Sequence, residues 1–217
     1  EFALSSHAKA STADVVKQLV TLPELAADEG IRAGGSLESL AGLRPAYYSE
    51  AVAQRFPEIG WNVTAANSSQ LSDGSAAVLI TTSEIAKRLG LAPKARLHSF
   101  AVVGDDPFLM LTAIVPATRK VLSRAGLTLD DIDLFEVNEA FAPVPLAWQA
   151  EFDADPAVVN PLGGAISVGH PLGASGAILT TRLIYHMRDR GIRYGVQAIC
   201  EGGGTANATL YELVDVP

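Results

Sequence analysis

The sequence predicts a layered α/β domain, and two observations support this. Strand-like and helix-like patterns alternate regularly from residue 95 towards the end of the chain. The expected strands DLFEVN (133–138) and GVQAIC (195–200) carry hydrophobic residues on both faces, as is typical of strands that are covered by helices on both sides. At 48% hydrophobic and 18% charged residues, the composition is that of a globular domain with a sizeable core.

The elements before this alternation are less regular. Residues 61–67 and 76–82 are rich in strand formers, and each predicts a β-strand. Residues 83–90 then predict a helix, with Ser83 as its N-cap and Gly90 as its stop.

The alternating region is easier to divide. Residues 95–104 predict a strand, and residues 116–126 predict a helix that begins at a proline and ends at a glycine. After the strand at 133–138, residues 139–152 begin a second helix that contains two prolines. A long helix at 173–191 carries one apolar stripe, and residues 205–214 predict the last strand. The stripe consists of Leu179, Leu183 and Met187.

Residues 1–57 contain short helical patterns without continuous strands, which predicts a lid or an excursion from the main domain. The chain opens on Glu1 without an initiator Met and within a helical pattern, so we expect further residues upstream.

Charge and cysteine content narrow the class of protein. A net charge of −8 argues against nucleic acid or an anionic membrane as the main partner, and the apolar runs are too short to span a bilayer. Cys200 is the only cysteine in the 217 residues, which fits a reducing compartment. We therefore expect a cytoplasmic protein.

Three short stretches carry candidate functional groups: VNEAFA (137–142), GGAISVGHPLGASG (163–176) and CEGGG (200–204). Each also has a purely structural interpretation. Cys200 can be a small buried hydrophobe, Asn138 can cap the next helix, and the glycines can form a hairpin turn. His170 lies between Gly169 and Pro171, which is an unusual place for a core histidine. Together, a thiol, an imidazole, a carboxamide and bare glycine backbone are suited to acyl transfer, because they can move protons and stabilise an oxyanion.

These three motifs, with DEGIRAGGSLESLAGLRPAYY (28–48) and VTAANSSQLSDGSAAVL (63–79), resemble the thiolase family over nearly the whole chain. The resemblance implies an α-β-α-β-α layered fold. Residues 1–57 would belong to the CoA-binding loop domain, residues 58–93 would end the N-terminal half, and residues 94–217 would form the C-terminal half.

The resemblance also implies an acyltransferase that makes or cleaves 3-ketoacyl-CoA by Claisen condensation or thiolysis, in fatty-acid or related acyl-CoA metabolism. His170 would activate a nucleophilic cysteine, and Cys200 would exchange a proton with the α-carbon of acetyl-CoA. Asn138 would hold a water that forms one oxyanion hole with His170, and the backbone N–H of Gly202 would serve the other. This role for Cys200 implies a depressed or tunable pKa.

Further residues match the family's contacts to CoA, which would be a substrate, with no cofactor and no metal. The expected contacts are Arg32 at the nucleotide end, Ser39 and Leu40 in the same groove, Ala65, Ser69 and Leu71 along the pantetheine, and Met110 and Phe141 near the thioester. Because thiolases form dimers or tetramers, we also expect association into a homo-oligomer.

One part of the family's pattern is absent. Cys200 belongs to the second cysteine motif, so the nucleophile would come from a missing N-terminal part or from another polypeptide. The alternative is a non-catalytic thiolase-like subunit that binds CoA or acts as a scaffold, although such a protein would need none of Asn138, His170 and Cys200.

Overall fold

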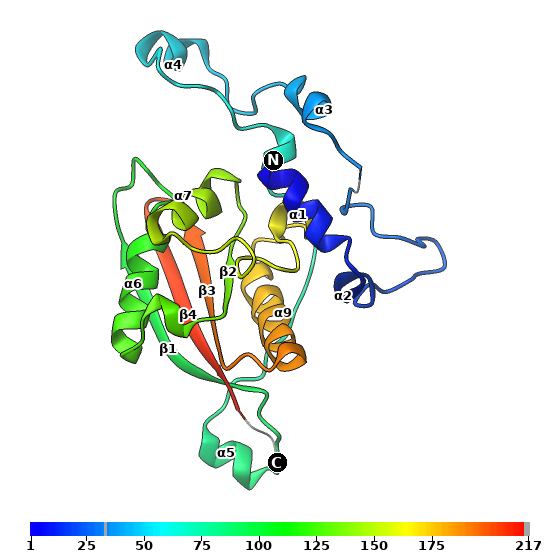
Figure 1. Ribbon diagram of the computed structural model, residues 1–217, viewed down its shortest axis with the longest axis vertical. Helices are drawn as coiled ribbons and strands as arrows, with labels where there is room; N and C mark the ends of the chain where they lie inside the picture. The colour runs from blue at the N-terminus through cyan, green and yellow to red at the C-terminus, as the bar shows by residue number, and fades with distance from the viewer. Residues whose placement is uncertain (33, 215–217) are drawn as a thin grey trace. The chain divides into compact units, whose positions relative to one another are not determined.

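A computed structural model describes residues 1–32 and 34–214 (Figure 1). The chain forms two compact units, and each is built from segments that are distant in sequence. Unit 1 contains Glu1–Ser72, Glu139–Leu146 and Pro161–His170, and unit 2 contains Asp73–Asn138, Ala147–Asn160 and the chain from Pro171 onward. Residue 33 of the predicted loop domain and residues 215–217 of the predicted C-terminal half lie outside the described residues.

Unit 1 consists of short helices and irregular segments. Its elements are α1 (Phe2–Ala10), α2 (Ala13–Val16), α3 (Leu37–Ala41), α4 (Glu50–Arg55), the 3-10 helix η1 (Ala65–Asn67) and α8 (Ala165–Val168). Helix α1 packs on α8, and Phe2, Ala3, Ala142 and Ile166 form a small apolar cluster. Neither α3 nor α4 has a buried residue. Most of the described residues between 11 and 59 are exposed.

Unit 2 contains a four-stranded mixed sheet in the order β1-β4-β3-β2. The strands are β1 (Ala95–Gly104), β2 (Leu134–Val137), β3 (Tyr194–Glu201) and β4 (Thr205–Leu213). Strand β4 runs antiparallel to both of its neighbours, whereas β2 and β3 are parallel. The other elements are α5 (Ser83–Arg88), α6 (Ile114–Ala125), η2 (Leu129–Asp131) and α9 (Ser175–Arg190), while α7 (Pro143–Phe152) has residues in both units. The predicted α/β class is confirmed.

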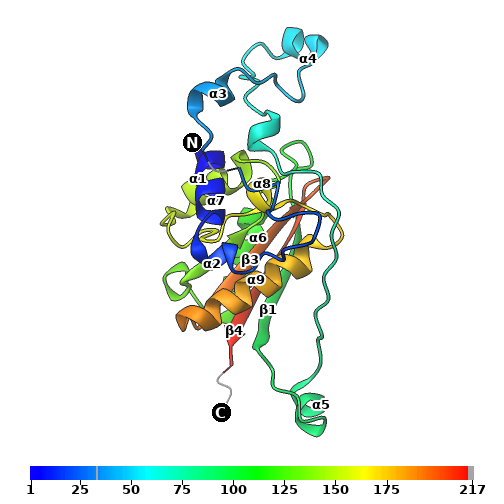
Figure 2. The same cartoon turned by 90° about the vertical axis from the view of Figure 1, so that its right-hand side faces the viewer.

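Helices α6 and α9 lie on opposite faces of the sheet (Figures 1 and 2). Helix α6 packs on β1, β4 and β3, and α9 packs on β3, β2 and β4. On the α9 face, a Cβ at Gly195 would lie 2.8 Å from the sulfur of Met187, so the missing side chain allows the helix to come close. Leu183 and Met187 are fully buried there, and Leu179 is nearly so, which confirms the predicted stripe.

The edge strand β1 differs from the prediction that both faces of the sheet are covered. Phe100 and Val102 are each 59% exposed. Lys120 and Arg124 of α6 donate to the carbonyl oxygens of Val102 and Phe100 at 3.1 and 2.7 Å. These two bonds pair backbone carbonyls of an edge strand, which would otherwise be open to another strand.

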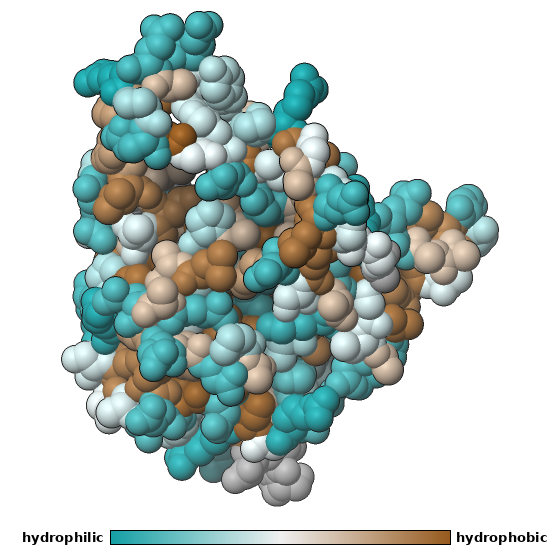
Figure 3. Space-filling model, turned by 45° about the horizontal axis from the view of Figure 1, so that its top comes forward, coloured by the Kyte–Doolittle hydropathy of each residue, from teal (hydrophilic) through white to brown (hydrophobic). Residues whose placement is uncertain are grey.

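Between residues 61 and 90, the structure differs from the elements that β-strand and capping propensities predict. No strand forms at 61–67 or 76–82, so both strand predictions are wrong. A β-forming run becomes a strand only beside a hydrogen-bonded neighbour, and Leu79 and Ile80 are instead 79% and 73% exposed. They belong to a wider set of hydrophobic residues at the surface, such as those in brown in Figure 3. The predicted cap Ser83 is also wrong, because the Thr82 hydroxyl accepts from the N–H of Ile85.

Helix α6 begins at Ile114, two residues before the expected proline. Pro116 is tolerated there because the first turn of a helix has unpaired N–H groups. As predicted, the helix ends at Gly126, which has a positive φ of 69°.

Candidate functional site

Two of the expected catalytic residues lie at adjacent strand ends in unit 2. Val137 of β2 is in register with Ala198 of β3, and the next residue, Asn138, donates its N–H to the Ala198 carbonyl at 2.9 Å. Cys200 follows Ala198 by two residues in β3. The parallel pairing therefore places Asn138 and Cys200 at the carboxyl ends of neighbouring strands, where α/β sheets hold their ligands.

The carboxamide of Asn138 is buried and has no hydrogen-bond partner in the described residues. Asn138 is only 2% exposed, and both its oxygen and its nitrogen lack a partner. Helix α7 begins at Pro143, so Asn138 does not cap it, and the capping interpretation is wrong. Burying an unsatisfied amide costs free energy, and such groups occur at sites that bind a ligand or a water.

A second asparagine, which the sequence analysis missed, holds the end of β2. Asn160 accepts the N–H of Val137 and donates to the Val137 carbonyl, both at 2.8 Å. Its φ of 46° is one that asparagine tolerates better than most residues. The sequence offered a weak signal, because Asn160 follows an apolar pair and precedes a proline.

The environment of Cys200 differs from the expected one. Burial, together with the charge of Glu201, raises the pKa of the Cys200 thiol from 9.0 to about 11, despite an opposing backbone hydrogen bond. The thiol is therefore neutral at pH 7. A depressed or tunable pKa was expected for this thiol, but burial is the largest cause of the shift and raises the pKa instead.

The glycines after Cys200 form the hairpin turn between β3 and β4. Gly203 and Gly204 have φ values of 81° and 83°. A Cβ at Gly204 would lie 2.8 Å from the Asp105 carbonyl oxygen, and Asp105 donates its N–H to Gly204 at 2.7 Å. The glycine turn thus packs tightly against the loop that follows β1.

That loop contains Met110, one of the expected pocket residues. Met110 has a positive φ of 59°, and it is exposed, as are Phe108 and Leu109 beside it. The glycine turn after β3 and the loop after β1 thus lie together in unit 2, and the loop exposes three large apolar side chains.

His170 is the last residue of unit 1 before the chain enters unit 2 at Pro171. It follows α8 and Gly169, whose φ is 90°, and it donates its N–H to the Gln70 carbonyl at 3.1 Å. Burial lowers the pKa of His170 below the ordinary 6.5. The imidazole is therefore neutral at pH 7, as a general base must be.

A buried carboxylate supports the helix that leads to His170. Glu139 is 1% exposed, and it accepts from the Ser6 hydroxyl at 2.7 Å and from the N–H of Ile166 at 3.3 Å. A Cβ at Gly164 would lie 2.3 Å from the Glu139 carboxyl carbon, so only glycine fits there. The motif NEAF contains Glu139, but its sequence gave no sign of this contact.

The expected CoA contacts other than Met110 all lie in unit 1. Ser69 donates its N–H to the Ala140 carbonyl at 2.9 Å, and Ser68 bridges Phe141, so two expected segments come together. Arg32, Ala65 and Leu71 are exposed, and Leu40 is half-buried. The Ser39 hydroxyl donates to the Ser36 carbonyl in the capping box of α3.

In the described part of the chain, no cluster of His, Cys, Asp and Glu side chains is arranged to hold a metal ion. Among the same residues, no helix combines the length and hydrophobicity that a membrane crossing requires.

The chain is similar to several known proteins. The family description "Thiolase, C-terminal domain" matches residues 91–213, and "Thiolase, N-terminal domain" matches residues 1–84. The steroid 3-ketoacyl-CoA thiolase FadA6 of Mycobacterium tuberculosis is 50% identical over 185 residues, covering 85% of this chain and 42% of that protein. The 3-ketoacyl-CoA thiolase of Aeromonas hydrophila is 42% identical over 230 residues, covering 99% of this chain and 57% of that protein.

Solved structures of thiolases also match the fold of this chain. The human mitochondrial 3-ketoacyl-CoA thiolase in complex with CoA matches with a TM-score of 0.87 and 35% identity, covering 99% of this chain and 54% of the other. The Bacillus anthracis acetyl-CoA acetyltransferase matches with a TM-score of 0.85 and 38% identity, covering 98% and 55%. The chain thus spans about half the length of the proteins it matches. Since one family description covers more than half of the chain and solved thiolases share its fold, the chain belongs to the thiolase family.

Proposed function

We propose that this chain supplies the acid–base and oxyanion part of an acetyl-CoA C-acyltransferase that makes or cleaves 3-ketoacyl-CoA. The observation that carries the proposal is the buried carboxamide of Asn138, which has no partner in the described part of the chain and lies beside the strand of Cys200 in a chain of the thiolase family. A protein that only bound CoA would gain nothing from this costly group.

The chemistry assigns one role to each group. In thiolysis, His170 would take the thiol proton of a cysteine from outside residues 1–217, and this cysteine attacks the 3-keto carbon. The bond between the α- and β-carbons of the substrate then breaks, and the acyl group stays on the cysteine as a thioester until CoA accepts it and returns its thiol proton to Cys200. Cys200 gives its proton to the departing α-carbon, and its neutral thiol at pH 7 suits this donor role. A water held by Asn138 and His170, and the N–H of Gly202, would stabilise the developing oxyanions.

CoA and its thioesters would be substrates, with no resident cofactor. We assign CoA contacts to Arg32, Ser39, Leu40, Ala65, Ser69, Leu71, Met110 and Phe141. Residues 1–57 would belong to a CoA-binding loop domain, residues 58–93 to the end of the N-terminal half, and residues 94–217 to the C-terminal half. We also propose a cytoplasmic homo-oligomer, and light scattering of the purified natural polypeptide tests its association.

The decisive experiment is thiolytic cleavage of a 3-ketoacyl-CoA by the natural polypeptide that contains these residues. Cys200→Ser and Asn138→Ala should each lower kcat by at least about 100-fold, whereas Asn62→Ala, at an exposed position, should not. Full activity of Cys200→Ser would contradict the acid–base role. Binding of CoA without any turnover by the wild type would support the non-catalytic subunit instead.

A further inference from the structure

The side chain of Gln70 connects two separate segments of unit 1. Its Nε2 donates to the Gly30 carbonyl at 2.8 Å, and also to the carbonyls of Ile166 and Ser167 at 2.9 and 3.2 Å. Gly30 belongs to the turn that leads to Arg32, and the other two acceptors belong to α8, just before His170. One carboxamide therefore bonds to both segments at once.

The backbone of Gln70 adds two bonds to the same helix and loop. Its carbonyl accepts the N–H of His170 at 3.1 Å, and its N–H donates to the Ala165 carbonyl at 3.4 Å. Substitution of the side chain leaves these groups in place. The bridge to Gly30 can thus be removed without removing the main-chain bond to His170.

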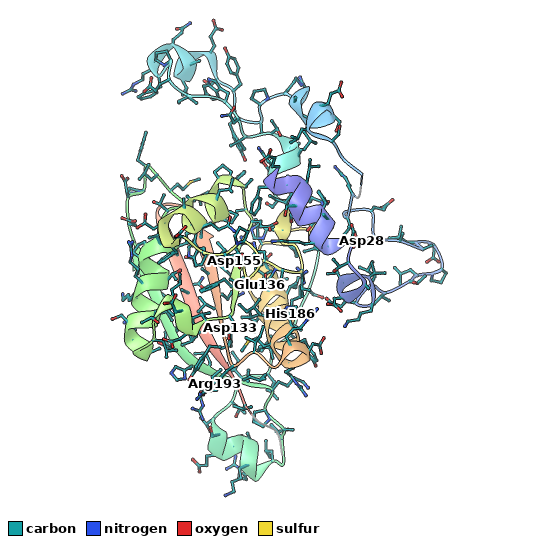
Figure 4. All side chains as sticks on the ribbon, viewed as in Figure 1. Asp28, Asp133, Glu136, Asp155, His186 and Arg193 are labelled. Atoms are coloured by element: carbon teal, nitrogen blue, oxygen red, sulfur yellow. The ribbon has the colours of Figure 1, made fainter. Side chains whose placement is uncertain are left out.

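The turn on the other side of the bridge is itself ordered. Asp28, labelled in Figure 4, accepts the N–H groups of Gly30 and Ile31 at 2.7 and 3.1 Å. Arg32 donates its N–H to Nδ1 of His7 at 3.1 Å. A Cβ at Gly30 would lie 3.1 Å from the Gln70 oxygen and 3.3 Å from the Ser167 carbonyl. The turn thus packs closely against Gln70 and against the helix that precedes His170.

We infer that Gln70 is a positioning residue that couples the turn at residues 28–32 to His170. When CoA binds at Arg32, the bridge orders the loop at 165–170 and so aligns the imidazole. This inference rests on the proposed function, because it takes CoA as the ligand of the turn. A donor is required here, since all three acceptors are carbonyl oxygens, and the two N–H groups of the amide are shared among them.

Two variants of the natural polypeptide test the coupling. Gln70→Met keeps the length of the side chain without a donor, and Gln70→Glu keeps its shape but places a carboxylate among three carbonyls. Both should lower kcat/KM for CoA by about tenfold or more, because a small misplacement of a catalytic group is costly. Gln54→Met is the matched control, because Gln54 is exposed in α4 and bonds only weakly to Glu50, and it should leave kcat and KM unchanged.

Hydrogen–deuterium exchange separates positioning from a merely structural role. CoA should protect the peptide that contains residues 165–170 in the wild type, but not in Gln70→Met. Gln70→Glu should regain part of its activity relative to the wild type as the pH falls, because a protonated carboxyl donates one hydrogen bond. If Gln70→Met does not fold, Gln70→Asn, whose amide is too short to bridge, replaces it.

The outcomes distinguish the two ideas. Equal protection by CoA and equal kcat/KM in wild type and variants would overturn the coupling and leave the proposed function standing. Protection by CoA that depends on Gln70, without any turnover by the wild type, would support the coupling and overturn the proposed function. A wild type that does not bind CoA would overturn both.

Discussion

Asn138 donates its backbone N–H to the carbonyl oxygen of Ala198 at 2.9 Å, one residue beyond the last β2 position in register with β3. The strand ladder thus fixes the backbone of Asn138, while its side chain has no hydrogen-bond partner among the described residues. Because the backbone bond does not depend on the side chain, substitutions at this position test the carboxamide separately from the fold.

Replacing the carboxamide of Asn138 should stabilise the protein while it removes activity. We expect Asn138→Leu to raise the free energy of unfolding by about 1 kcal/mol, since it removes a buried unsatisfied amide. Urea denaturation measures the change. The control is Asn160→Leu, which leaves both backbone groups of Val137 unpaired and should destabilise by about 3 kcal/mol. Destabilisation of similar size in both variants would refute this account.

The thiol of Cys200 should react slowly at neutral pH. Burial raises its pKa to about 11, so little thiolate is present at pH 7, and only the thiolate is alkylated rapidly. The rate of iodoacetamide modification, followed by peptide mass spectrometry, should rise up to about pH 11 in the native protein. In urea the same curve should level off nearer the ordinary pKa of 9.0. A native plateau below pH 9 would contradict the raised pKa.

The same pKa shift makes native stability depend on pH. Since the folded pKa of Cys200 is raised above the unfolded one, the neutral thiol is favoured in the native state. Its contribution is fully present below pH 9 and is lost as the pH rises towards 11, by at most about 3 kcal/mol. Chemical denaturation at pH 8 and pH 10.5 measures the loss, and Cys200→Ala should show a smaller pH dependence over this range.

Gly163→Ala should destabilise unit 1. Gly163 has a φ of 71°, and an added Cβ would lie 2.6 Å from the Ser6 carbonyl oxygen. Left-handed strain and the clash together should cost about 2–4 kcal/mol. Gly42→Ala is the matched control in the same unit, because Gly42 has a φ of −81° and nothing within 4 Å of an added Cβ. Thermal denaturation measures the melting temperature of each variant. An equal change in both would show that crowding at Gly163 is unimportant.

Thr118→Val should weaken the packing of α6 against Trp148. The Thr118 hydroxyl accepts from Trp148 Nε1 at 2.9 Å and donates to the Ile114 carbonyl at 2.8 Å, and both side chains are fully buried. Valine would leave the indole N–H unpaired, at a cost of about 1–3 kcal/mol. Thr181→Val is the control, since Thr181 makes the same helical bond to Ala177 at an exposed position. It should change the free energy of unfolding little, and urea denaturation compares the two variants.

Prediction from sequence was accurate where local pattern and packing agree. Strand β1 has the predicted limits, and α9 buries the predicted apolar stripe, because a 3.6-residue period leaves one face for the core. The predicted strand that contains Leu79 and Ile80 does not form, since a strand needs a hydrogen-bonded neighbouring strand that the local sequence pattern does not reveal.

The sequence by itself determined the α/β class, the helix that ends at Gly126, the glycine turn after Cys200 and, through the resemblance, membership of the thiolase family. Only the tertiary structure decided that Asn138 is buried with no side-chain partner in the residues that the structure describes, that Asn160 and Glu139 support their neighbours, and that burial raises the pKa of Cys200. The physical reason is that hydrogen-bond satisfaction and desolvation depend on residues distant in sequence. Gln70 illustrates this, because its three acceptors lie 40, 96 and 97 positions away.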